Sequence, residues 1–167
     1  MTNKACVHLY CGDGKGKTTT AVGLAVRFAG RSGKVVLAQF LKDGTSGECR
    51  ALAKLETVTM LAANPVGKFS FQMNEEEKQR TADAVQRTFA AAAGYAVREG
   101  AGLLILDEVC AAIRCGFLDG RPDTLEVVLT GRDPSEALQE RADYITEMVK
   151  RRHPFDDGVT AREGIEW

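Results

Sequence analysis

Short apolar runs recur along the chain, and most of them are followed by a stretch with helical periodicity. The runs predict strands at Ala5–Cys11, Val35–Leu41, Val58–Leu61, Leu103–Leu106, Leu125–Thr130 and Tyr144–Val149. The periodic stretches predict helices at Thr18–Gly30, at a short segment that ends near Leu55, at a long segment after Asn74, and at Val109–Phe117. Continuous apolar strands separated by helices are typical of parallel sheets covered on both faces. The pattern therefore predicts an α/β fold with a mostly parallel sheet flanked by helices.

Two helix starts carry capping signals. Asn74 precedes three glutamates, which predicts an N-cap and an acidic first turn that interacts favourably with the helix dipole. The buried stripe of this helix is predicted at Ala82, Val85, Phe89 and Ala93. Farther along, Asp133-Pro134-Ser135-Glu136 predicts Asp133 as the N-cap, proline at the first helical position, and a capping-box glutamate.

Length and composition limit the function classes. A chain of 167 residues can bury one substantial core, so we expect a single domain over residues 1–167. The net charge of −1 gives no electrostatic footprint for nucleic acid. No apolar run approaches the roughly 18 residues that cross a bilayer, and no signal-peptide core is present. The five cysteines form no C-x-x-C pair, so we expect buried thiols in a cytoplasmic protein rather than a zinc site.

A glycine-rich segment joins the first predicted strand to the first predicted helix, and it reads Gly12-Asp13-Gly14-Lys15-Gly16-Lys17-Thr18-Thr19. Glycines let the backbone wrap around phosphate oxygens, and the N–H groups of a helix N-terminus supply positive partial charge. Lys17 adds a full charge from a position that we expect to be exposed, and the Thr18 hydroxyl can ligate Mg²⁺. The common pattern has Gly where this chain has Cys11. The segment nevertheless predicts binding of a nucleoside triphosphate.

Charged side chains follow two other predicted strands at the same sheet edge. Asp107 and Glu108 end the strand that begins at Leu103, where a carboxylate can hold Mg²⁺ directly or through water. Arg132 follows the strand that ends at Thr130 and could reach a phosphate, or could instead pair with a nearby aspartate.

Two aromatic residues, Phe69 and Phe71, lie in the predicted loop Ala62–Met73. Such a pair usually anchors its loop in the core. In a nucleotide-binding protein it could instead form an apolar lid over a second, flat substrate. Both interpretations stay open from the residues alone.

These motifs together resemble those of the ATP:corrinoid adenosyltransferases across nearly the whole chain. The matching segments are Gly12–Thr19, Gln39–Lys42, Gly47-Glu48, Phe69-x-Phe71, Leu106–Glu108, Thr130–Arg132 and His153–Glu166. The resemblance implies a RecA-like P-loop fold and transfer of the 5′-deoxyadenosyl group of MgATP to the Co(I) centre of a reduced corrinoid, with release of triphosphate. Because cobalt is then the nucleophile, the protein has to position the substrates and stabilise the leaving group.

The resemblance also implies roles for single residues. The loop from Gly12 to Thr19, with Lys17, would neutralise the triphosphate. Thr18 and Glu108 would hold Mg²⁺, with Asp107 as a water-mediated partner. The remaining implied contacts are Arg27 and Arg132 to the nucleotide, and Phe69 and Phe71 to the lower face of the corrinoid. A homodimer is implied as well, and a flavoprotein reductant is compatible with the resemblance.

The chain departs from the family pattern at three places. Phe71 stands where relatives often have Trp, and the segment Leu118–Thr124 is shorter than in relatives. The first predicted strand begins at Ala5, so we expect no preceding arm of the kind that some relatives place over the nucleotide.

Two other functions remain open from the residues. A P-loop phosphotransferase or NTPase would use Glu108 to orient water or an acceptor hydroxyl and would produce ADP. A binding module would carry nucleotide or corrinoid without turnover. The three functions differ in their phosphate product: adenosyl transfer releases triphosphate, phosphoryl transfer releases diphosphate, and a binding module releases neither.

Overall fold

The computed structural model describes residues 4–40, 42, 44–63, 72–110 and 121–165. Within these residues, six strands form one all-parallel sheet in the order β3-β2-β4-β5-β1-β6. The strands are β1 (Val7–Cys11), β2 (Val35–Phe40), β3 (Val58–Ala63), β4 (Leu103–Asp107), β5 (Glu126–Thr130) and β6 (Tyr144–Glu147). The parallel sheet flanked by helices confirms the predicted α/β fold and is of the P-loop NTPase type.

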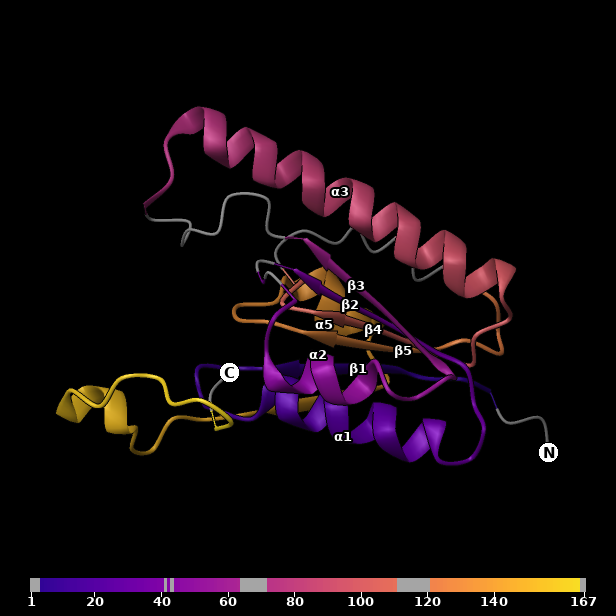
Figure 1. The fold of residues 1–167 in the computed structure, drawn as a ribbon, viewed down its shortest axis with the longest axis horizontal. Coiled ribbons are helices and arrows are strands. Elements are labelled where there is room, and N and C mark those ends of the chain that lie inside the picture. Colours follow the sequence, from indigo (N-terminus) through magenta and orange to yellow (C-terminus); the bar gives the residue numbers. More distant parts are fainter. Residues whose placement is uncertain (1–3, 41, 43, 64–71, 111–120, 166–167) are drawn as a thin grey trace.

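Helices cover both faces of the sheet (Figure 1). The described helices are α1 (Lys17–Ala29), α2 (Gly47–Leu52), α3 (Glu75–Arg98), α5 (Glu136–Arg141) and the 3₁₀ helix η2 (Pro154–Asp157). The long helix α3 packs on one face over β2, β3 and β4, and α1 packs on the other face. None of the helices in the described residues has the length and apolar character needed to cross a membrane.

The central strands are continuously apolar because both of their faces are covered. In β2, Val36 and Ala38 belong to the core beneath α3, whereas Val35 and Leu37 belong to the core beneath α1. All six residues of β2 are buried. Side chains alternate between the two faces of a strand, so β2 carries apolar residues on both faces, with Gln39 as the polar exception near its carboxyl end.

The long helix begins where the sequence predicts but turns a slightly different stripe to the sheet. The Asn74 side chain accepts from the backbone N–H of Glu77, and the Glu77 carboxylate accepts from the backbone N–H of Asn74, which completes a capping box. The buried residues are Thr81, Val85, Ala92 and Ala96, with Phe89 partly buried against the same core. The predicted stripe is therefore wrong at Ala82, which is exposed. The small polar Thr81 takes the inner position, where its hydroxyl contacts Met73.

The predicted N-cap at Asp133 is also wrong. Ser135 is the N-cap of α5, and its side chain accepts from the N–H of Leu138. Asp133 instead adopts a left-handed φ of 46° in the turn after β5. Of the predicted helix Val109–Phe117, Val109 and Cys110 are not helical, and the remainder lies outside the described residues.

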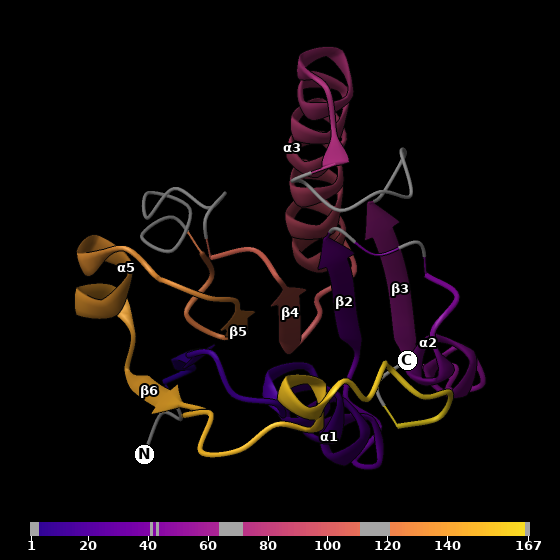
Figure 2. The ribbon, with the colours of Figure 1, turned by 90° about the vertical axis from the view of Figure 1, so that its left-hand side faces the viewer.

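The strand order decides which segments meet at the carboxyl edge. β5 separates β1, which leads into the glycine-rich loop, from β4, which ends in Asp107. All strands are parallel, so their carboxyl ends share one edge. The segment after β6 crosses this edge and runs past α1 (Figure 2).

Candidate functional site

The glycine-rich loop is curled around the side chain of Lys17. Gly12 and Gly16 have φ values of 96° and 121°, which only glycine adopts without strain. The Lys17 ammonium donates to the carbonyls of Gly12 at 2.7 Å and Gly14 at 2.9 Å. Lys17 is only 7% exposed, so the expected exposed position is wrong. The loop thus presents a cation that is already fixed in place.

The residues that follow β6 are hydrogen-bonded to the glycine-rich loop. The N–H of Gly14 donates to the carbonyl of Met148 at 2.6 Å. The carboxylate of Asp13 accepts from the N–H of Lys150 at 2.9 Å, and this bond lowers the pKa of Asp13. The negative charge of Asp13 is therefore stabilised by a backbone N–H from the segment after β6.

The buried carboxylate of Asp107 accepts from four side chains, which come from α1, β5, β2 and the segment after β2. It accepts from the hydroxyl of Thr18 at 2.9 Å and from that of Thr130 at 2.6 Å. It also accepts from the amide of Gln39 at 3.2 Å and the ammonium of Lys42 at 3.0 Å. Asp107 is 1% exposed, so these partners replace the water that the carboxylate loses.

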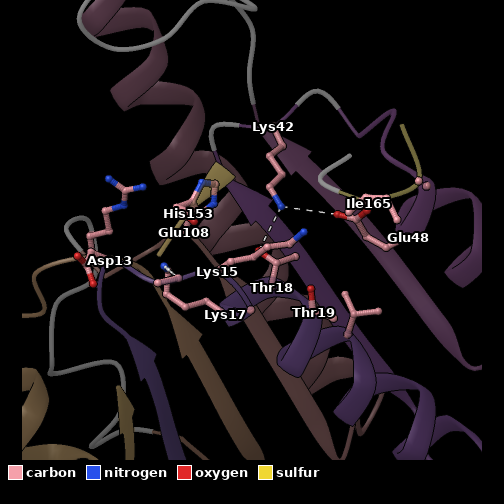
Figure 3. A pocket seen from close by; sticks show the side chains of 16 residues that line it. Asp13, Lys15, Lys17, Thr18, Thr19, Lys42, Glu48, Glu108, His153 and Ile165 are labelled. Carbon is pink, nitrogen blue, oxygen red and sulfur yellow. Dashed lines mark hydrogen bonds and ion pairs between the residues drawn. The ribbon is translucent and has the colours of Figure 1, made fainter. Parts of the chain in front are cut away.

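Lys42 bridges Asp107 and Glu48, and Figure 3 shows its contact with Glu48. Its ammonium lies 3.6 Å from Glu48 Oε1 as well as 3.0 Å from Asp107 Oδ2. Burial opposes the charge of Lys42, but Asp107, Glu48 and Glu108 together raise its pKa. Burial likewise opposes the charge of Glu48, but hydrogen bonds, chiefly from Gln39, and the charge of Lys42 lower its pKa.

Glu108 differs from Asp107 in its position. It has a left-handed φ of 63°, and its N–H donates to the hydroxyl of Thr130 at 2.9 Å. This turn directs Glu108 to the lining of the cavity, whereas Asp107 contacts Thr18. A non-glycine residue with this φ costs of order 1–3 kcal/mol, and such strain gathers at functional sites.

The loop opens on a cavity of about 540 Å³. Its lining includes the loop from Asp13 to Thr19, together with Lys42, Glu48, Glu108, Arg132, His153 and Ile165. Figure 3 shows the labelled side chains among them converging from the glycine-rich loop, the start of α1, the segments after β2 and β4, α2 and the C-terminal segment. Such a volume is within the range of small-molecule sites.

Among the described residues, one sequence-predicted contact, Arg27, is not in the cavity lining. Arg27 lies exposed in the last turn of α1, ten residues and about 15 Å from the loop end of the helix. Phe69 and Phe71 lie outside the described residues, so their predicted contact with a second substrate stays a prediction.

Buried thiols lie beneath the loop. Cys110 packs against Gly131, and burial, with the nearby Cys11 and Glu108, raises the pKa of Cys110 to about 12. Burial also raises the pKa of Cys11. Cys11, Cys49 and Cys110 are buried and free, as expected. Cys6 is free but only partly buried, so the expectation is wrong there, and Cys115 lies outside the described residues.

The sequence motifs include Gln39, Lys42 and Glu48, but the motifs alone predict no role for these three residues. Their place around Asp107 depends on β2 lying beside β4. One local signal was available: a polar Gln39 interrupts an otherwise apolar strand immediately before its carboxyl end.

Comparison with known proteins agrees with this arrangement of motifs. The family model described as ATP:corrinoid adenosyltransferase BtuR/CobO/CobP matches residues 3–167. A corrinoid adenosyltransferase of Pseudomonas aeruginosa is 29% identical over 95% of this chain and 82% of its own length. A corrinoid adenosyltransferase of Sinorhizobium sp is 27% identical over 98% of this chain and 81% of its own length. One of Escherichia coli K12 is 27% identical, over 98% and 86%.

Proposed function

This chain belongs to the ATP:corrinoid adenosyltransferase family, and we propose that it transfers the 5′-deoxyadenosyl group of MgATP to the Co(I) centre of a reduced corrinoid. The electron pair of Co(I) forms the new bond to the ribose C5′. The C5′–O bond breaks, and its electron pair leaves on the triphosphate. The transfer needs no nucleophile from the protein.

One observation supports this function best: a fixed cationic loop faces a cavity large enough for a nucleotide. Lys17 is held in advance by Gly12 and Gly14, and Arg132 lines the same cavity. Charges fixed before the reaction stabilise a developing anion without reorganisation. In the proposed reaction that anion is the leaving triphosphate, which the glycine-rich loop would bind.

The residues present fit a magnesium ion. Thr18, Asp107 and Glu108 offer the hydroxyl and carboxylate oxygens that Mg²⁺ prefers, and the ammonium of Lys42 already lies among such oxygens. When bound, Mg²⁺ would neutralise charge on the phosphates. We propose that Thr18 and Glu108 hold it, with Asp107 orienting Thr18 or acting through water.

The remaining assignments rest on chain length, on the cysteine pattern and on the family. We propose a single nucleotide-binding and adenosyltransferase domain that works in the cytoplasm as a homodimer, with a flavoprotein as its reductant. Arg27 would contact the nucleotide only if the nucleotide or a second subunit reached the far end of α1.

The test is an anaerobic incubation of the protein with MgATP and chemically reduced cobalamin. A new cobalt–carbon bond, detected by its light-sensitive absorbance, should form together with triphosphate. Formation of ADP would indicate phosphoryl transfer instead, and absence of any product would indicate a binding module.

Lys17→Met should lower this activity by about a hundred- to a thousandfold, because the variant lacks the fixed charge that opposes the triphosphate. Lys34→Met is the matched control, since Lys34 lies at the opposite end of the sheet beside Glu99. Near-normal turnover of Lys17→Met at saturating ATP would contradict the role of the loop.

Phe69 and Phe71 are proposed to cover the lower face of the corrinoid and so to assist reduction of Co(II). The double alanine variant should then lose more activity with Co(II) and a weak reductant than with pre-formed Co(I). It should also fail to form four-coordinate Co(II), as seen by electron paramagnetic resonance. Equal losses in both assays with a large fall in Tm would show that the two aromatics anchor the loop.

A further inference from the structure

The ammonium of Lys42 lies among three oxygen groups. Its nitrogen is 3.0 Å from Asp107 Oδ2, 3.3 Å from Thr18 Oγ1 and 3.6 Å from Glu48 Oε1. The three groups come from β4, α1 and α2, so only the folded sheet edge assembles them. A hydroxyl beside two carboxylates is also a set of hard oxygen ligands of the kind that divalent cations use.

The ammonium balances a charge that cannot reach water. Asp107 is 1% exposed, and a buried carboxylate without a cation is costly. Lys42 supplies one positive charge at this position. A divalent cation held by Thr18 and Glu108 beside Asp107 would lie within a few ångströms of the ammonium, which is itself 3.3 Å from Thr18 Oγ1, and at that separation like charges repel strongly inside a protein. The ammonium and the metal ion therefore compete for one place.

Lys42 is able to leave this place. Its side chain is 31% exposed and lines the cavity, and its four-carbon stem is flexible. Asp107 would keep its neutral donors, Thr18, Thr130 and Gln39, when the ammonium departs. The carboxylate is thus supported in both arrangements, which makes an exchange feasible.

We propose that Lys42 is a tethered cation that occupies the magnesium position in the nucleotide-free enzyme and moves onto the triphosphate when Mg²⁺ enters. The proposal rests on the proposed use of MgATP. It makes Lys42 a positioning residue that disfavours metal binding before nucleotide. The triphosphate supplies the anionic partner that the displaced ammonium needs, so metal and nucleotide bind together.

The test measures Mn²⁺ affinity of the nucleotide-free protein by electron paramagnetic resonance, without corrinoid. Lys42→Met should bind Mn²⁺ about tenfold more tightly or better, since one competing charge is gone. Lys42→Arg, which keeps the charge, should stay within a few-fold of the unmodified protein. Lys34→Met, at the other end of β2, should leave the affinity unchanged. Unchanged or weaker Mn²⁺ binding by Lys42→Met would overturn the proposal.

A second measurement needs no variant at Lys42. Acetylation of the native protein, read by mass spectrometry, should accelerate at Lys42 when Mg²⁺ is added, relative to NaCl of equal ionic strength. Acetylation at Lys34 should not change. Equal rates at Lys42 in both salts, at Mg²⁺ concentrations where Mn²⁺ competition shows the site filled, would refute the exchange. Neither readout depends on adenosyl transfer, so the exchange and the proposed reaction can fail separately.

Discussion

Gly14→Ala should loosen the contact between the phosphate loop and the end of β6. An alanine Cβ at this position would lie 2.6 Å from the carbonyl oxygen and 2.7 Å from the carbonyl carbon of Met148. Comfortable contacts between such atoms begin near about 3.5 Å, so the two segments must separate by roughly 1 Å. Both atoms are backbone, and no side-chain rotation can relieve the overlap. The hydrogen bond from Gly14 to Met148 would stretch as well.

The expected loss of stability is about 2 kcal/mol, from overpacking and one weakened hydrogen bond. For a domain of this size that corresponds to a fall in Tm of about 4–8 °C. Thermal and urea unfolding would measure the loss. Trypsin should also cut faster after Lys150, because Lys150 is anchored to Asp13 in the same loop.

Gly23→Ala is the matched control. Gly23 lies inside α1, and a Cβ there would meet no atom within 4 Å. Alanine in a helix interior should stabilise the protein by roughly 0.5–1 kcal/mol. If Gly14→Ala were as stable as the unmodified protein and trypsin cleaved it after Lys150 at an unchanged rate, the close packing of the loop against Met148 would be refuted.

Two further predictions concern titration. The pKa of Glu48 in the folded protein lies below its ordinary value of 4.5, so its stabilising contribution is present above that pH and is lost as the pH falls through the folded value. In Glu48→Gln, the Tm should therefore decrease less steeply as the pH falls below 4.5. An unchanged dependence of Tm on pH in this range would contradict the prediction. Because the pKa of Cys110 is about 12, only about 10⁻⁴ of this thiol is ionised at pH 8. Iodoacetamide at pH 8 should spare Cys110 in the native protein and modify it in urea, and rapid native modification would show that this thiol is not buried.

Features that depend on a few neighbouring residues were predicted from the sequence. The largely apolar run of β2 requires burial on both faces, and the N-cap at Asn74 and its acidic first turn lie within four residues. In the glycine-rich loop between β1 and α1, Gly12 and Gly16 adopt the positive φ values that favour glycine, so the sequence supplies the residue type that this turn requires. The resemblance to a known family rested on such local motifs, and the family match over residues 3–167 confirmed it.

Local signals failed where two explanations fit the same residues. Both Asp133 and Ser135 can cap a helix, and the turn after β5 decides for Ser135 by placing Asp133 in a left-handed conformation. Both Thr81 and Ala82 can face a sheet, and the angle at which α3 meets the sheet decides for Thr81. Sequence periodicity fixes a helical stripe only to within about one residue, because each residue turns the helix by about 100°.

The charge balance of the site was decided only by the tertiary structure. Asp107 meets Thr18 from α1, Gln39 from β2, Lys42 from the segment after β2, and Thr130 from β5, and these donors lie up to 89 residues from Asp107 along the chain. Strand order brings them together, and no local pattern encodes which strands are neighbours. A buried carboxylate accepts whichever donors the sheet edge supplies, so the pairing of Lys42 with Asp107 exists only in the assembled fold.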